Sequence, residues 1–146
     1  MVSLTSEGFI NTRDWHRAIV GGKGMILRRT SALEFLELFS GYMNGKEIDV
    51  YAKRRYEYEN ITYCIVDTFD GINYIDSGGV LCTTINQTIN DMLADLDSID
   101  EQPLVEALSK YYFTHDKSFT DLTILPENIE CFSNLKDWAI EYYNEG

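Results

Sequence analysis

The sequence has few of the residues from which catalytic and metal sites are usually built. Its 146 residues include two histidines and three cysteines, with no CxxC pair. A zinc site needs about four closely spaced ligands, and a disulfide framework needs paired cysteines, so the sequence predicts neither. The motifs GxGxxG, GxxxxGK[ST], HExxH and GxSxG are also absent. We therefore expect a protein that is not an enzyme and that binds no metal or cofactor.

Long apolar runs are missing as well. No run reaches the roughly 18 to 20 residues that a membrane-spanning helix needs, and residues 1–7 lack the features of a secretory signal. Cys64 and Cys82 lie in strand-like apolar runs, where a buried thiol acts as a small hydrophobic group. Together with the distant Cys131 they indicate a reducing compartment. We expect a cytoplasmic protein that does not associate with a membrane.

Positive charge is scarce in the C-terminal two-thirds of the chain. Residues 1–55 contain nine basic and six acidic side chains, whereas residues 56–146 contain three basic and eighteen acidic ones. Their net charges, +3 and −15, disfavour direct DNA binding and favour a basic protein partner. An acidic surface that serves only solubility is the alternative. The charge asymmetry also leaves open that the chain forms a homo-oligomer.

Proline occurs only at positions 103 and 126, and neither a flexible linker nor a repeat is present. Residues 1–146 are therefore expected to form a single domain. The periodicity predicts an α+β fold: helices flanking a small, mostly antiparallel sheet, followed by a helical C-terminal half. Strands are expected as a meander over residues 48–52, 61–66, 72–75 and 80–82.

Helix signals flank these strands on both sides. A first helix is expected over residues 13–20, and Ser31-Ala32-Leu33-Glu34 has the form of a capping box that starts a helix of about three turns. The later signals are a second capping box at Thr84–Gln87, Pro103 and Pro126 in first helical turns, and Ser133 as the cap of a last helix that buries Trp138.

The densest acidic stretch is a candidate binding site for a basic partner. It comprises Asp91, Asp95, Asp97, Asp100 and Glu101. The residues lack the spacing of a calcium-binding loop, but Asp91 and Asp95 lie four positions apart and share one face of the expected helix. A solvated helix face is the alternative interpretation.

A basic cluster follows the first expected strand of the meander. It comprises Lys53, Arg54 and Arg55 and is followed by Tyr56 and Tyr58. Cations next to aromatic rings are candidates for phosphate contacts, but interleaved glutamates weaken that interpretation, and a basic hairpin tip is the alternative. Exposed tyrosines here would also suit a protein interface.

The order of these motifs is similar to that of a known family. A helix with Ser31-Ala32-Leu33, then strands, then Thr88-Ile89-Asn90-Asp91-Met92-Leu93, then a helix over residues 107–112 resembles the effector domain of AbiEi-type antitoxins. That family carries a similar SAL helix, a strand pair and an RTI-x-D helix start. The likeness covers about residues 12–125 and leaves 126–146 as a C-terminal helical extension.

The resemblance implies an antitoxin of a type IV toxin–antitoxin (abortive infection) system that counteracts a nucleotidyltransferase-like toxin in phage defence. Two departures matter: Gln87 replaces the family's arginine, and no winged helix-turn-helix precedes the first helix, so operator binding is not carried over. The alternative is an acidic inhibitor encoded by a phage or mobile element. Such an anti-CRISPR-like protein would mimic nucleic acid and occupy a basic nuclease effector.

Overall fold

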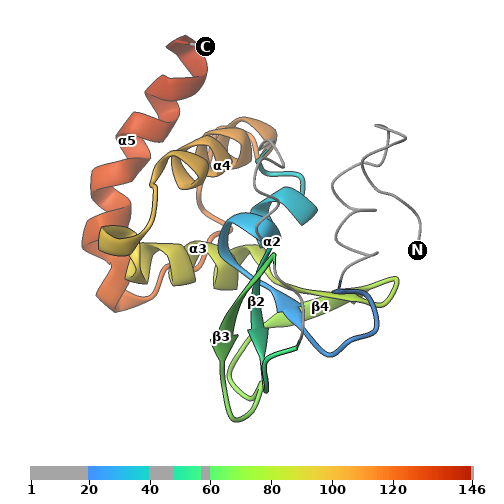
Figure 1. Ribbon diagram of the computed structural model, residues 1–146. Helices are drawn as coiled ribbons and strands as arrows, with labels where there is room; N and C mark the ends of the chain where they lie inside the picture. Colours follow the sequence, from blue (N-terminus) through green and yellow to red (C-terminus); the bar gives the residue numbers. More distant parts are fainter. Residues whose placement is uncertain (1–19, 40–47, 57–59, 146) are drawn as a thin grey trace.

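The computed structural model describes residues 20–39, 48–56 and 60–145, with side chains up to residue 142. It confirms the α+β fold class: a five-stranded sheet is combined with helices that dominate the C-terminal half (Figure 1). The elements in chain order are β1 (Ile26–Leu27), α2 (Arg29–Phe35), β2 (Ile48–Ala52), β3 (Ile61–Ile65), β4 (Tyr74–Ser77), β5 (Val80–Thr83), α3 (Ile85–Ala94), the 3-10 turn η1 (Leu96–Ser98), α4 (Gln102–Thr114), the 3-10 turn η2 (Pro126–Asn128) and α5 (Ile129–Glu145).

The sheet is mixed, with strand order β3-β2-β1-β5-β4. The pairs β1–β2 and β4–β5 are antiparallel, whereas β1–β5 and β2–β3 are parallel. The expected mostly antiparallel meander is therefore wrong. The two-residue strand β1 lies between β2 and β5, and of the expected hairpins only β4–β5 forms, around the left-handed Gly78 and Gly79 (φ +60° and +91°).

One part of the core lies between the sheet and α2. Alternate residues of β2, Ile48, Val50 and Ala52, are buried in a cluster with Ala32 and Phe35 of α2. Because successive side chains of a strand point to opposite faces, Asp49 and Tyr51 lie on the other face of β2. This alternation places two polar side chains beside the helices.

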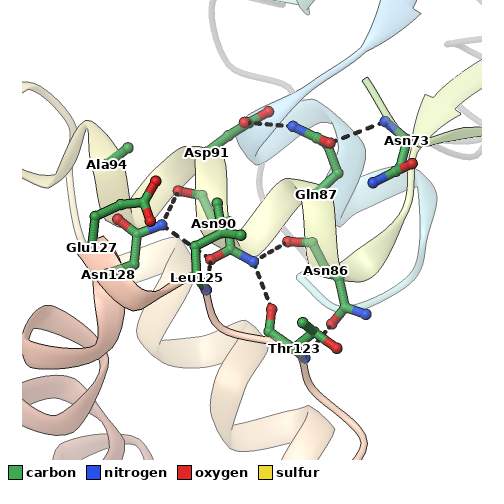
Figure 2. Close-up of a pocket in the computed structure, with 10 residues that line it drawn as sticks. All are labelled: Asn73, Asn86, Gln87, Asn90, Asp91, Ala94, Thr123, Leu125, Glu127 and Asn128. Carbon is green, nitrogen blue, oxygen red and sulfur yellow. Dashed lines mark hydrogen bonds between the residues drawn. The ribbon is translucent and has the colours of Figure 1, made fainter. Parts of the chain in front are cut away.

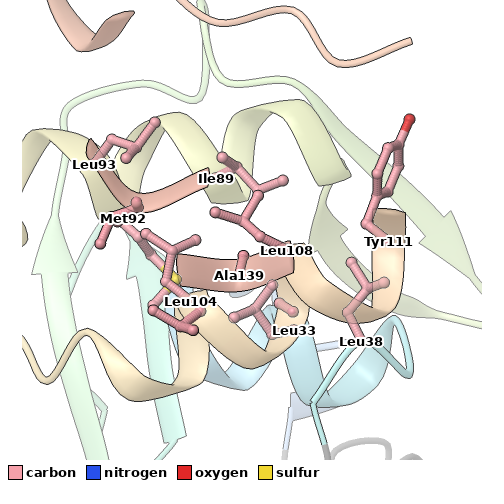
Figure 3. Packing of buried hydrophobic residues seen from close by; sticks show 12 residues of the cluster. Leu33, Leu38, Ile89, Met92, Leu93, Leu104, Leu108, Tyr111 and Ala139 are labelled. Atoms are coloured by element: carbon pink, nitrogen blue, oxygen red, sulfur yellow. The ribbon is translucent and has the colours of Figure 1, made fainter. Parts of the chain in front are cut away.

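A second part of the core joins the four helices (Figure 3). Leu33 of α2 is buried in one cluster with Ile89 of α3, Leu108 of α4 and Ala139 of α5. In Figure 1, α3, α4 and α5 lie together on one side of the sheet. None of the helices in the described part of the chain is both long and apolar enough to cross a bilayer.

Some helix boundaries were predicted correctly from local sequence patterns, and others were not. Thr84 is the N-cap of α3, with its Oγ1 accepting a hydrogen bond from the Gln87 amide at 3.2 Å. The expected capping box is only half formed, because the Thr84 amide donates to the Asn73 carbonyl and not to the Gln87 side chain. Pro103 lies in the first turn of α4, as expected, and Pro126 begins η2. Ser31 does not cap α2: the helix begins at Arg29, and the Ser31 hydroxyl accepts from the Asp49 amide at 2.9 Å. The helix ends at Phe35, before the left-handed Glu37 (φ +64°).

The last helix also departs from expectation. α5 begins at Ile129, directly after η2, so Ser133 lies inside the helix and is not its cap. Trp138 was expected in the core but is 41% exposed. The three cysteines form no disulfide bond, and Cys82 is buried, as expected for a small hydrophobic group. The expected helix over 13–20 lies outside the described residues except for its last residue, Val20, which is helical.

Candidate functional site

The polar residues of α3 gather on one side of the helix. Asn86, Gln87, Asn90 and Asp91 follow one another at the spacing of a helical face, while the opposite side, including Ile89, is buried in the helical core. This polar face has two edges. One edge meets β2 and the start of β4, and the other meets the segment that leads into α5.

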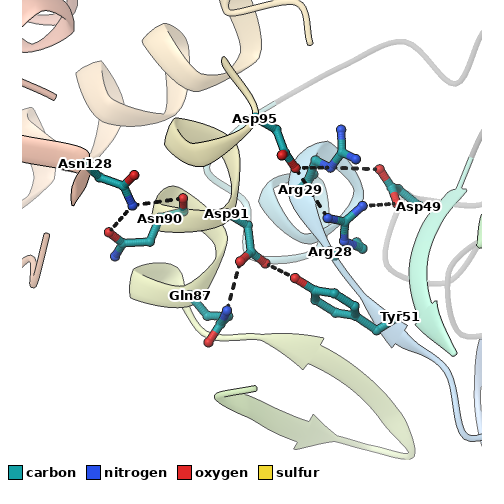
Figure 4. A network of polar contacts seen from close by, with 9 residues as sticks. All are labelled: Arg28, Arg29, Asp49, Tyr51, Gln87, Asn90, Asp91, Asp95 and Asn128. Atoms are coloured by element: carbon teal, nitrogen blue, oxygen red, sulfur yellow. Dashed lines mark hydrogen bonds and ion pairs between the residues drawn. The ribbon is translucent and has the colours of Figure 1, made fainter. Parts of the chain in front are cut away.

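The first edge is held by a chain of hydrogen bonds through Asp91 (Figure 4). The Tyr51 hydroxyl donates to Asp91 Oδ2 at 2.7 Å, and Gln87 Nε2 donates to Asp91 Oδ1 at 2.9 Å. Gln87 Oε1 in turn accepts from the Asn73 amide at 3.0 Å. Burial, together with the hydrogen bond to Asp91, raises the pKa of Tyr51, so the phenol stays protonated and remains a donor. Asp91 therefore ties α3 to β2.

An ion cluster lies beside this chain, where α2 begins (Figure 4). Arg28, only 5% exposed, pairs with Asp49 at 3.0 Å and with Asp95 at 3.7 Å. Arg29 Nε lies 3.5 Å from Asp49 and 3.6 Å from Asp95. Burial by itself lowers the pKa of Arg28, but the charge of and hydrogen bond to Asp49, with a smaller contribution from Tyr51, raise it above its ordinary value. The guanidinium carbon also lies 4.6 Å from the centroid of the Tyr51 ring. The arginines thus neutralise the half-buried Asp49 and the more exposed Asp95, whose side chain is 41% exposed.

At the second edge of α3, Asn90 organises the neighbouring backbone (Figure 2). Its Nδ2 donates to the carbonyls of Asn86 and Thr123, each at 2.8 Å. Its Oδ1 accepts from the Leu125 amide at 2.9 Å and from Asn128 Nδ2 at 3.0 Å. Because all four of its hydrogen-bonding positions are occupied, Asn90 fixes residues 123–128 against α3.

Between α3 and this segment lies a pocket of about 350 Å³ (Figure 2). Its lining contains two carboxylates, Asp91 and Glu127, and no basic residue. Amides supply most of the remaining polar groups. The lining residues are Asn73, Asn86, Gln87, Asn90, Asp91, Ala94, Thr123, Leu125, Glu127 and Asn128. Such a pocket suits a small group that is rich in hydrogen-bond donors and positively charged.

Two large apolar side chains on α5, Ile129 and Trp138, are exposed, nine positions and about 13.5 Å apart along the helix. The exposed residues of this helix recur at helical spacing along one side, which we call the α5 outer face: Ile129, Glu130, Ser133, Asn134, Asp137, Trp138 and Glu141. Ile129 is 51% exposed and Trp138 is 41% exposed. Leu125 and Glu127, which line the pocket, are exposed just before this helix. Apolar centres among carboxylates are typical of interaction surfaces.

The structure divides the acidic stretch that the sequence singled out. Asp91 and Asp95 are engaged with Tyr51, Gln87 and the arginines, as described above. Asp97 and Asp100 are exposed, and Asp100 Oδ1 accepts from the Gln102 amide at 3.0 Å, at the start of α4. Glu101 is half-buried. These five residues therefore do not form one solvated acidic face.

The basic cluster is exposed, and each of its side chains lies over an aromatic ring. The distances are 5.0 Å from Lys53 to Phe69, 4.5 Å from Arg54 to Tyr56, and 5.8 Å from Arg55 to Tyr63. The Tyr56 hydroxyl donates to the Lys23 carbonyl at 3.1 Å, and Tyr58 lies outside the described residues. Because β2 and β3 are parallel, the cluster follows β2 but is not the tip of a hairpin.

Of the residues that line the pocket, only Asp91 was singled out from the sequence. A usable signal was present: amides at positions 86, 87 and 90 with Asp91 make one polar face of a helix whose N-cap was recognised. Asn128 and Glu127 carried no comparable signal, because their neighbours on α3 are more than thirty residues away in the chain. Asp49 is a charged residue within an apolar strand, which indicates that it pairs with another buried group, but the sequence does not identify that group.

Comparisons with known proteins give no relative. No protein-family model and no curated protein matches the chain. Among the described residues, no group of three or more His, Cys, Asp or Glu side chains is placed to hold a metal ion. The function must therefore be inferred from the surfaces themselves.

Proposed function

We propose that the protein is a non-enzymatic regulator that acts by binding a basic protein partner. We further propose that it is a stand-alone antitoxin of the AbiEi type, whose partner is a nucleotidyltransferase-like toxin. The observation that carries the proposal is the α5 outer face, which presents the carboxylates of Glu130, Asp137 and Glu141 with exposed Ile129 and Trp138 at its two edges.

Such a face has the composition of a binding surface. Tryptophan is one of the residue types enriched among those that contribute most binding energy in protein interfaces, and Trp138 is 41% exposed. Acidic groups around it select a partner of opposite charge and speed the encounter. The basic residue of α5, Lys136, is half-buried and does not belong to the exposed α5 outer face. The three carboxylates of that face leave it net negative, so it favours positive charge on the partner's interface.

The packing of the antitoxin-like motifs supports the same proposal. Leu33, from the Ser31-Ala32-Leu33 motif, lies in one buried cluster with Ile89 and Met92, from the Thr88–Leu93 motif. Both motifs therefore serve the same part of the core, as expected if they belong to one ancestral domain. Gln87, which stands where the family has arginine, keeps a polar role by bonding Asp91 and Asn73.

The proposal is tested by identifying the partner and then by rescue of growth. The tagged full chain is used to purify partners from nuclease-treated host lysate, and the toxin recovered is co-expressed with each variant. Asp137→Lys together with Trp138→Ala should abolish relief of growth arrest. Asp67→Lys, a matched charge reversal at an exposed position after β3, should leave it intact. Absence of relief by the unaltered chain would contradict the antitoxin proposal.

A second candidate function is the acidic inhibitor of a nucleic-acid-binding effector. The exposed carboxylates of Asp97 and Asp100, added to those on α5, favour it. It predicts that the recovered partner is a basic nuclease and that single-stranded nucleic acid competes with the protein for it. Asp97→Asn with Asp100→Asn would then weaken binding; Asp95 is left unchanged because it pairs with Arg28 and Arg29.

A further inference from the structure

The pocket between α3 and residues 123–128 has a lining that matches one chemical group. We propose that it binds the guanidinium group of an arginine side chain presented by the protein partner. This inference rests on the proposed function, because it names the side chain by which a basic partner is anchored. The evidence is the charge of the lining, the unused acceptor capacity of its oxygens and its position beside the first residue of the α5 outer face.

The charge of the pocket selects a cation. Asp91 and Glu127 are its only ionisable lining residues, and no basic side chain compensates them there. Asp91 receives its two hydrogen bonds from neutral donors, Tyr51 and Gln87, so neither donor provides a compensating positive charge. Glu127 is exposed and makes no ion pair with the described residues. A neutral ligand would leave both charges uncompensated.

The pocket contains oxygen atoms that can accept further hydrogen bonds, which matches a ligand group that only donates hydrogen bonds. Asn128 is 4% exposed, and its Nδ2 donates to Asn90, but its Oδ1 accepts nothing from the described residues. It lies beside Glu127 in the pocket wall (Figure 2). Each carboxylate oxygen of Asp91 also retains acceptor capacity beyond the single bond that it receives. A guanidinium carries five donors and no acceptor, so it can satisfy several of these oxygens at once.

The position of the pocket fits an anchor from a partner. Leu125 and Glu127 line it and are also exposed next to Ile129, the first residue of the α5 outer face. A protein docked on that face would therefore reach the pocket with one long side chain. Asn90 holds the wall in place before binding, so little ordering is required when the side chain enters. A volume of about 350 Å³ accommodates such a side chain.

The test uses the isolated full chain and a small probe. N-acetyl-L-arginine N-methylamide is titrated at low ionic strength, and the side-chain amide signals of Asn86, Asn90 and Asn128 are followed by NMR. The citrulline analogue, which has nearly the same shape without the charge, is the control ligand. The arginine probe should shift these signals with a dissociation constant in the millimolar range, and the citrulline probe should bind at least about tenfold more weakly.

Matched variants separate this pocket from the general negative field. Glu127→Gln should weaken the arginine probe about tenfold, as expected for one charge-assisted hydrogen bond. Glu130→Gln removes the same charge from a nearby residue that does not line the pocket, and it should change binding less than about twofold. Equal effects of the two variants, equal binding of citrulline, or no shift at about 100 mM probe would each overturn the proposal.

The result is independent of whether a partner is found. The titration involves no toxin or nuclease, so its failure leaves the partner purification and growth assay standing. Conversely, a purification without a partner would contradict the proposed function and still leave probe binding to the pocket measurable.

Discussion

Glu34 allows a direct test of how burial changes the pKa of a carboxyl group in this protein. The residue lies on α2, half-buried, and makes no ion pair with the described residues. Burial raises the pKa of its carboxyl group from 4.5 to about 7. Replacing it by glutamine, which cannot ionise, should make the free energy of unfolding less dependent on pH.

The sign follows from proton linkage. Because the pKa of Glu34 is higher in the folded state than in the unfolded one, folding takes up a proton at intermediate pH. The stability associated with the protonated carboxyl is complete below pH 4.5 and is lost as the pH rises through 7. The full difference in pKa corresponds to about 3 kcal/mol. Since Glu34 is only half-buried, solvent screening reduces the effect to about 1 to 2 kcal/mol.

The assay is urea unfolding followed by circular dichroism at pH 4 and pH 8. Glu34→Gln should be about 1 to 2 kcal/mol more stable than the unaltered protein at pH 8 and nearly equal to it at pH 4, below the pKa of the unfolded state. Glu37→Gln, at an exposed position three residues later, should show no such difference between the two pH values. The reasoning is refuted if Glu34→Gln changes the free energy of unfolding equally at both.

Three further predictions concern packing and polar contacts. Leu108→Ala should lower the free energy of unfolding by about 2 to 5 kcal/mol, because it leaves a cavity in the helical core. Trp138→Ala should lower it by less than about 1 kcal/mol, since Trp138 is 41% exposed. Both are measured by urea denaturation, and equal losses of stability would place the Trp138 ring in the core. Thr84→Ala should cost about 1 kcal/mol by removing the cap of α3; an unchanged melting temperature would contradict this. Asp91→Ala should cost about 1 to 3 kcal/mol because it leaves the Tyr51 hydroxyl without its acceptor, whereas the exposed Asp97→Ala should stay within about 0.5 kcal/mol in the same assay.

The parts of the fold that depend on neighbours in sequence were predictable. The strand over residues 48–52 was predicted with its observed bounds, because period-two alternation is a local pattern. The N-cap of α3 at Thr84, the first turn of α4 at Pro103 and the start of η2 at Pro126 were also predicted. In each case the side chain that defines the element acts on backbone atoms a few residues away.

The sheet topology was not predictable, because it depends on pairing between residues that are far apart in the chain. β1 consists of Ile26 and Leu27, too short to show any periodicity, yet it occupies the centre of the sheet. Ser31 also shows that a local pattern does not identify the partner of a side chain. Its hydroxyl has the chemistry and spacing of a helix cap, but it accepts a hydrogen bond from the Asp49 amide, eighteen residues away. The same group serves either role, and only tertiary structure selects one.

The candidate site shows this limit most clearly. Helical spacing correctly placed Asp91 and Asp95 on α3 or at its end, but their partners lie far away in the chain. Tyr51 is forty residues from Asp91, and Arg28 is still farther from Asp95. An acidic residue whose charge is neutralised internally looks the same in sequence as one that faces solvent. The expected acidic face was therefore divided by contacts that local spacing does not encode.

This division determines where a basic partner can meet the protein. Arg28 and Arg29 are committed to Asp49 and Asp95, so those carboxylates add little to the outer field. On the other edge of α3, the pocket carboxylates and the α5 outer face have no basic side chain among them. Attraction for a cation is strongest where negative charge is not compensated and water is partly excluded. A basic partner is therefore expected to engage the α5 outer face and the pocket together, and to leave the Arg28 cluster untouched.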